Sequence, residues 1–244
     1  MLTVLIHVLI QIGPILRALL RPNREPSARI AWIVVILAVP VLGIVAYALL
    51  GETNLGRARV SRLAQVKAAL PGPPQIAGMT EAAAQATLHE RHEPLFRMGQ
   101  SISDFSALAG NHATLMEDSD AAIRHMVADI DAAQDHVHLM FYIWLPDGNG
   151  TRMAEALIRA TARGVTCRAM VDDLGSRALV KSDLWAKMSA AGVRLVRALS
   201  VGNPLWRALT GRIDLRNHRK ILVIDNAITY CGSQNCADPE FLVK

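Results

Sequence analysis

Cysteine and charged residues are both scarce in this chain of 244 residues. Its three cysteines are too few, and odd in number, for a disulfide-stapled secreted scaffold. Charged residues make up only 19% of the chain and apolar residues 52%, which excludes a disordered or collagen-like protein. The length is sufficient for one large domain or two modest ones.

A strong excess of positive charge is also missing from most of the chain. The net charge is +5, and the first 50 residues hold +3 of it, from four arginines and one glutamate. The rest of the chain carries only +2, which argues against a general nucleic-acid-binding protein.

Residues 30–50 form an apolar run of 21 residues without a charge. A helix of this length spans roughly 30 Å, the thickness of the hydrocarbon core of a bilayer. Trp32 and Tyr47 lie near its two ends, where amphipathic rings prefer to sit. Pro40 and Gly43 are tolerated in lipid. The run therefore predicts a membrane-spanning helix, with a buried core helix as the alternative.

The stretch from Leu2 to Leu20 is also apolar, although it contains His7 and Arg17. We expect a second spanning helix here, with a re-entrant segment or an interfacial helix as alternatives. Residues 1–50 are thus predicted to form a transmembrane helical hairpin. Basic residues flank both sides of the second apolar run, so charge does not indicate the orientation.

Residues 51–105 are predicted to be a connector. Residues 57–70 have helical spacing, with a basic face that suits either anionic lipid headgroups or solvent. Pro71-Gly72-Pro73-Pro74 ends this helix, and a short helix is predicted over residues 82–92.

From residue 106 to residue 244 the pattern indicates one α/β lobe. Helices are expected to alternate with strands that pair in parallel, and a last strand pair with a tight turn makes the sheet mixed. The predicted helices cover residues 121–134, 151–163 and 182–191, and the predicted strands cover residues 136–144, 165–171, 193–199, 220–224 and 228–231.

The segment NHRKILVIDNAITYCGSQN, residues 217–235, carries the candidate chemistry. On an extended strand, His218 and Lys220 point the same way about 6–7 Å apart. An imidazole can attack phosphorus or transfer a proton, and an ammonium can neutralise phosphoryl oxygens. Asp225 is a candidate to orient a histidine.

Three later residues of this segment, Gly232, Ser233 and Asn235, can supply a loop with neutral donors and acceptors. They reach the histidine only if this loop folds back beside the strand. The alternative is a basic surface strand followed by an ordinary loop. The composition of this chain makes the full spacing very improbable by chance.

The pattern HxKxxxxDxxxxxxGSxN resembles the signature of the phospholipase D superfamily without a mismatch. The phrases GRIDLRNHRKILVIDN and GSQNCADPEF, with the apolar N-terminal run, resemble its bacterial cardiolipin synthase branch. Asn226 and Cys231 stand where that branch often has glycine and threonine, and neither is a reacting group of the motif.

The resemblance implies phosphatidyl transfer without a metal or other cofactor, in a bacterial inner membrane. Phosphatidylglycerol would be the substrate, and a histidine would carry the phosphatidyl group before a second lipid alcohol accepts it. His218 would be nucleophile or acid/base, Lys220 the phosphate ligand and Asp225 a support for histidine in the assembled site. Gly232, Ser233 and Asn235 would complete the phosphate pocket.

Members of the superfamily build one site from two such motifs, and none of the other seven histidines is followed two residues later by lysine. We therefore expect an N-terminal fragment with half an active site, inactive alone, that needs a missing C-terminal half. The alternatives are a single-motif phospholipase D-like phosphodiesterase or hydrolase that acts as a homodimer, and an inactive membrane protein.

Several weaker candidates have plainer interpretations. His136 and His138 share a strand face and can ligate a metal, but a buried histidine is favoured. Asp172 with Asp173 can bind Mg²⁺, although a capping role is favoured. The aromatic run of residues 140–144 is expected in the core, while Trp144 and Trp206 can touch acyl chains. A cluster of arginines before the motif can gather anionic headgroups or face solvent: Arg207, Arg212, Arg216 and Arg219.

Overall fold

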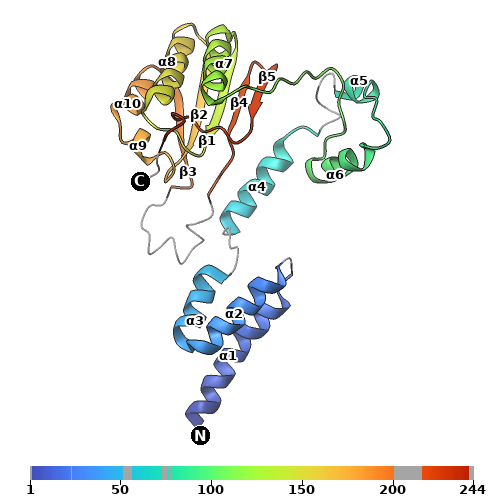
Figure 1. Cartoon of the computed structure of the whole chain (residues 1–244), viewed down its shortest axis with the longest axis vertical. Coiled ribbons are helices and arrows are strands. Elements are labelled where there is room, and N and C mark those ends of the chain that lie inside the picture. Colours follow the sequence, from blue (N-terminus) through green and yellow to red (C-terminus); the bar gives the residue numbers. More distant parts are fainter. Residues whose placement is uncertain are drawn as a thin grey trace. The chain divides into compact units, whose positions relative to one another are not determined.

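The computed structural model describes residues 2–22, 24–51, 57–72, 76, 79–200 and 216–241 (Figure 1). These residues form an N-terminal helical segment, a connector and an α/β lobe.

The N-terminal segment contains four helical elements: α1 (Leu2–Leu20), α2 (Pro26–Ala38), α3 (Pro40–Ala46) and the π-helical turn η1 (Tyr47–Gly51). Its buried cluster is formed by Ala18, Ile36 and Tyr47. The ring of Tyr47 meets Trp32 edge-on with centroids 5.5 Å apart. These rings were expected at the two ends of one long helix, and here they meet because the chain bends back between them.

The bend lies at Val39 and Pro40. A proline disfavours the helical conformation of the residue before it, and Val39 has φ −134° and ψ 76°. The predicted continuous helix over residues 30–50 is therefore wrong, because it is divided into α2, α3 and η1. Among the described residues, no helix combines the length and the apolar character needed to cross a membrane.

Two arginines cap the carbonyl ends of these short helices. Arg29 donates to the carbonyl oxygens of Leu19 and Arg21 at 3.0 and 2.9 Å, where α1 ends. Arg24 donates to the carbonyl of Gly51 at the end of η1. A cation at a helix C-terminus satisfies orphan carbonyls and interacts favourably with the helix dipole, so Arg29 stabilises the end of α1 and Arg24 the end of η1.

The connector contains α4 (Arg57–Ala69), α5 (Met79–Ala84) and α6 (Glu93–Ser103). The helix predicted over residues 57–70 is confirmed. The short helix predicted over residues 82–92 is wrong: α5 ends at Ala84, and α6 begins again at Glu93 with Pro94 in its first turn. Proline is well tolerated there because the first helical amides have no intrahelical acceptor.

The α/β lobe contains a five-stranded mixed sheet with strand order β3-β2-β1-β4-β5. The strands β1, β2 and β3 pair in parallel, whereas β4 runs antiparallel to β1 and β5 antiparallel to β4. The predicted mixed sheet is confirmed. Its strands are β1 (His136–Phe141), β2 (Thr166–Asp172), β3 (Arg194–Ala198), β4 (Ile221–Ile224) and β5 (Ile228–Cys231).

Among the described residues of the lobe, four helices accompany the sheet: α7 (Ser119–Ala132), α8 (Gly148–Ala162), α9 (Arg177–Val180) and α10 (Asp183–Ala190). Side chains alternate along β1, so Val137, Leu139 and Phe141 are buried. Helices α7 and α8 pack side by side against the sheet (Figure 1). Of the described helices of this lobe, α9 is the one that the sequence pattern did not predict, because a single helical turn is too short for a periodic signal.

We expect Gly43→Ala to disrupt the packing of α3 against α2. A Cβ at Gly43 would lie 2.5 Å from the carbonyl oxygen of Val35, and this backbone atom cannot move aside as a side chain can. Overpacking of this kind costs about 1–3 kcal/mol. Amide hydrogen exchange of the chain in detergent micelles should become faster over Pro40–Ala46.

Gly13→Ala is the matched control, because nothing lies within 4 Å of a Cβ at Gly13 in α1. Exchange over Pro40–Ala46 should stay at its original rate in this variant. Equal rates in both variants would show that Gly43 is not a close-packing position.

Candidate active site

The histidine and the lysine of the motif lie at the carboxyl edge of the parallel strands, together with the loop that follows β5. Ile221, the first residue of β4, pairs with Met140 of β1 on one side and with Cys231 of β5 on the other. Lys220 comes directly before Ile221, and Gly232 comes directly after Cys231, so the two residues lie at the same edge of the sheet. The turn after β1 leaves the sheet at the same edge, so three distant segments of the sequence meet there.

His218 and Lys220 both contact the ring of Tyr142. The rings of His218 and Tyr142 are stacked with centroids 3.9 Å apart and planes inclined by 30°. Lys220 Nζ lies 5.6 Å from the centroid of the Tyr142 ring and donates to the carbonyl oxygen of His218 at 2.8 Å. The structure thus brings the imidazole and the ammonium together, on an irregular segment before β4 rather than on the predicted strand.

The aromatic run after β1 divides between two environments. Phe141 and Trp144 are buried, as expected for core residues, and their rings meet edge-on. Tyr142 is only partly buried, and the expectation that it is a core residue missed its contact with His218. Strand alternation could have revealed that Tyr142 is not a core residue, because Tyr142 follows buried Phe141 and so points to the opposite face. Trp206 lies outside the described residues.

Asp225 lies at the other end of β4 from His218. Its carboxylate accepts the backbone N–H groups of Gln134, Asp135 and His136 at 2.8, 3.0 and 2.8 Å. These hydrogen bonds lower the pKa of Asp225, and the one from Gln134 has the largest effect. The four residues of β4 span on the order of 13 Å, so Asp225 and His218 are not brought together in this lobe.

Asp225 also forms the turn between β4 and β5. Asp225 and Asn226 have φ of 49° and 53°, and Ala227 N–H donates to the carbonyl of Ile224 at 2.9 Å. Left-handed conformations at the two central residues of this turn match the twist of the strands, which explains an Asp-Asn pair here. The predicted tight turn is confirmed, and Asp225 joins it to the start of β1.

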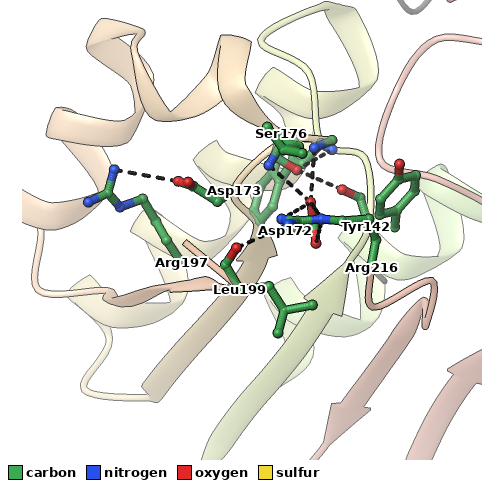
Figure 2. A network of polar contacts seen from close by, with 10 residues as sticks. Tyr142, Asp172, Asp173, Ser176, Arg197, Leu199 and Arg216 are labelled. Atoms are coloured by element: carbon green, nitrogen blue, oxygen red, sulfur yellow. Dashed lines mark hydrogen bonds and ion pairs between the residues drawn. The ribbon is translucent and has the colours of Figure 1, made fainter. Parts of the chain in front are cut away.

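A buried ion pair holds the segment before His218 to the end of β2. Arg216 Nη2 lies 2.8 Å from Asp172 Oδ1, and Arg216 Nε is 3.0 Å from Oδ2. The two side chains are 9% and 1% exposed. Asp172 also accepts the N–H groups of Leu174 and Gly175, both at 3.0 Å, and Arg216 donates to the carbonyl of Leu199 (Figure 2).

This pair changes the interpretation of both residues. Arg216 neither faces solvent nor is available to lipid headgroups, because its guanidinium is committed to Asp172. The favoured capping role of Asp172 is present in its contacts to Leu174 and Gly175. Asp173 is paired with Arg197 at 3.5 Å. Arg207 and Arg212 lie outside the described residues.

The GSQN loop follows β5 and runs back toward the segment after β1. Cys236 N–H donates to the carbonyl of Ile143, and Leu145 N–H donates to the carbonyl of Cys236, both at 3.0 Å. Gly232 and Ser233 are exposed, whereas Asn235 is partly buried. Asn235 Oδ1 is a buried acceptor without a hydrogen-bond partner among the described residues. The loop therefore does fold back to the edge that holds His218.

His136 and His138 lie on β1 toward the edge of the sheet that holds Asp225, opposite the edge that holds His218. His136 contacts Asp135 and Asn226, and His138 contacts the guanidinium of Arg168. Burial, together with Arg168, lowers the pKa of His138. In the part of the chain that the structure describes, no cluster of three metal-ligating side chains is present.

The chain is similar to known proteins in two segments. Residues 126–243 match the family model described as "Cardiolipin synthase, PLD-like domain", and residues 3–52 match "Phospholipase_D-nuclease N-terminal". Cardiolipin synthase A of Escherichia coli O1:K1 / APEC is 35% identical over 243 residues, covering 98% of this chain and 49% of that protein. Cardiolipin synthase A of Salmonella arizonae is 36% identical over 232 residues, covering 94% and 46%.

The chain spans about half the length of the curated relatives that it matches. Among solved structures, a phospholipase D family member, Nuc from Salmonella typhimurium, is 22% identical with a TM-score of 0.35. That match covers 46% of this chain and 63% of the other.

We expect Asp225→Asn to destabilise the lobe at neutral pH. Asparagine tolerates the left-handed backbone, but its amide nitrogen cannot accept the N–H groups that the carboxylate accepts. The expected loss is about 1–3 kcal/mol. The measurement is unfolding of the chain by denaturant, followed by circular dichroism, at pH 7 and in acid.

The difference between the two proteins should depend on pH. The folded-state pKa of Asp225 is lowered, so its stabilisation is complete above the unfolded pKa of about 4 and is lost as pH falls through the folded value. The stability of Asp225→Asn should therefore approach that of the original chain in acid. A constant difference at every pH would contradict this assignment.

We expect Arg216→Ala to destabilise the lobe by about 3–5 kcal/mol, because it leaves the buried Asp172 carboxylate without its counter-charge. Arg216→Lys keeps the charge but not the paired contacts of the guanidinium, so an intermediate loss is expected. Arg219→Ala removes an exposed arginine three residues away and should change stability by less than about 0.5 kcal/mol. Equal unfolding midpoints for Arg216→Ala and Arg219→Ala would contradict the role of the ion pair.

Proposed function

This chain belongs to the cardiolipin synthase family of the phospholipase D superfamily, and on that premise we propose that it carries half of a phosphatidyltransferase active site. The proposed donor is phosphatidylglycerol, and a second phosphatidylglycerol or another phospholipid alcohol is the acceptor. The observation that carries the proposal is the joint placement of His218 and Lys220 on Tyr142 at the carboxyl edge of the sheet.

The proposed reaction has two displacements at phosphorus. An imidazole nitrogen of His218 attacks the phosphorus, the bond to the glycerol oxygen breaks, and glycerol leaves with a proton from a general acid. The hydroxyl of the acceptor lipid then attacks the phosphatidyl-histidine, loses its proton to the same group and releases the imidazole. Lys220 neutralises the phosphoryl oxygens in both transition states.

We propose that the general acid is a second histidine, supplied by a polypeptide segment beyond this half-site. A single imidazole cannot serve as nucleophile and as acid in the same displacement, because the nitrogen that attacks becomes bonded to phosphorus. In the alternative assignment, His218 is the acid/base and the second half supplies the nucleophile. A homodimer that pairs two copies of His218 is the alternative source of the second group.

Ser233 and Asn235 are proposed to complete the phosphate pocket with Gly232. The support is the return of the GSQN loop to the edge of His218, through the hydrogen bonds of Cys236 to Ile143 and Leu145. For Asp225 we propose a structural role, since its carboxylate is occupied by backbone N–H groups at the other end of β4.

The N-terminal helices are proposed to anchor the protein in the bacterial inner membrane. Their outward side chains are large and apolar, and Leu20, Ile30, Val41 and Leu42 are 62–73% exposed. Apolar side chains around a packed helical unit are stable in lipid rather than in water. Such an anchor would hold the half-site beside its phospholipid substrates.

The proposal predicts no cardiolipin synthesis by these 244 residues alone, since the leaving glycerol lacks its acid. The chain should be expressed in bacteria that lack cardiolipin, and the lipid extract analysed by mass spectrometry. Formation of cardiolipin by the chain, and its loss in His218→Asn, would contradict the need for a second half and support the homodimer.

The same experiment should include a longer protein, in which this chain is joined to a second half that carries its own HxKxxxxD segment. This longer protein should form cardiolipin from phosphatidylglycerol, and His218→Asn should lower its rate by at least about 10³-fold. Arg219→Ala is the control, because this neighbouring side chain is exposed. Release of phosphatidic acid in place of cardiolipin would overturn transfer in favour of hydrolysis.

A further inference from the structure

We propose that Tyr142 is a positioning residue, which holds the His218 imidazole and the Lys220 ammonium in register for attack on a phosphoryl group. This inference rests on the proposed function of His218. Tyr142 lies 76 residues before His218 and outside the histidine motif, so only the folded chain joins them.

The histidine has little else to fix its ring. His218 is exposed, and it lies on an irregular segment before β4, where no strand pairing holds it. Within the described part of the chain, no side chain forms a hydrogen bond with its imidazole, and the stacked ring of Tyr142 is its aromatic contact. Without Tyr142, the imidazole would be free to change rotamer.

Tyr142 itself is held firmly from the opposite side. Ser176 Oγ donates to the carbonyl oxygen of Tyr142 at 3.1 Å and accepts Trp144 N–H at 2.9 Å (Figure 2). Ser176 is fully buried. A Cβ at Gly175 would lie 2.4 Å from the Tyr142 carbonyl oxygen and 3.1 Å from ring atom Cε2, so only glycine allows this loop to approach the tyrosine.

The same loop also holds the backbone that leads to His218. Asp172 begins the loop, and its carboxylate is paired with Arg216, two residues before the histidine. Ser176 N–H donates to the carbonyl of Asp172 at 3.0 Å, which closes the loop on itself. One loop thus fixes the approach of the chain through Arg216 and the ring of the histidine through Tyr142.

The stacked arrangement suits the chemistry. An aromatic face attracts both an imidazolium and an ammonium, so Tyr142 draws His218 and Lys220 toward one surface. Stacking covers a face of the imidazole and leaves its two nitrogens at the ring edge, where they can reach phosphorus or a proton. This role requires the ring of Tyr142 but not its hydroxyl.

The test compares Tyr142→Phe, which keeps the ring, with Tyr142→Leu, which removes it. The chain is labelled at histidine with ¹³C and studied by NMR in detergent micelles, with His218→Gln to assign the signal. The stacked ring should displace the His218 ring-proton resonance upfield in the original chain and in Tyr142→Phe. In Tyr142→Leu this displacement should disappear.

Two further variants separate positioning from general damage. Tyr230→Leu removes a partly buried tyrosine of β5, whose hydroxyl donates to Asp129, and should leave the His218 resonance unchanged. Gly175→Ala keeps the tyrosine at position 142 but displaces it from the histidine. The His218 resonance should therefore move toward that of Tyr142→Leu. An unchanged His218 resonance in both Tyr142→Leu and Gly175→Ala would overturn the proposal.

Kinetics of the extended protein distinguish this inference from the proposed function. Tyr142→Leu should lower kcat by about 10- to 100-fold with little change in KM, and Tyr142→Phe should restore it. An active protein whose kcat is unaffected by Tyr142→Leu overturns the positioning role and leaves the transfer reaction standing. A protein without transferase activity overturns the proposed function, and the proposal for Tyr142 as a catalytic positioning residue falls with it.

Discussion

The candidate site depends on the buried ion pair between Asp172 and Arg216. Either charge alone would be costly at 1% and 9% exposure, so the two side chains must stay together when the lobe folds. This requirement joins the carboxyl end of β2 to the segment that enters β4, although the two are 44 residues apart. Because His218 follows Arg216 by two residues, the same pair determines where the imidazole lies, and the loop from Asp172 to Ser176 places Tyr142 against it.

The strand β4 is held at both of its ends by charged side chains that satisfy buried or backbone polar groups. Before it, Arg216 meets Asp172; after it, Asp225 accepts three backbone N–H groups that precede and begin β1. The histidine motif therefore divides by function along one short strand. Its histidine and lysine lie at the open edge, and its aspartate fixes the register of β4 beside β1 from the opposite edge.

The N-terminal segment shows how a local constraint overrides an overall pattern. The apolar run over residues 30–50 is as long as a bilayer-spanning helix, but Val39, the residue before Pro40, has a non-helical conformation, which a following proline favours. The chain bends between α2 and α3, Tyr47 returns to Trp32, and Arg24 caps the carbonyl end that the bend brings near. Apolar periodicity reports which residues avoid water, whereas the break in the helix is set by one residue.

The sequence by itself determined the α/β lobe, the mixed sheet, the tight turn at Asp225 and the histidine motif, because apolar periodicity, turn residues and motif spacing are local properties of the chain. It did not reveal the stacking of Tyr142 on His218, the burial of Arg216 or the hydrogen bonds between the Asp225 carboxylate and the backbone N–H groups that lead into β1. Those outcomes were decided by tertiary structure. Parallel strand order and the antiparallel return of β4 bring together residues that are 44 to 91 positions apart, and no local pattern records which side chains meet at the edge of a sheet.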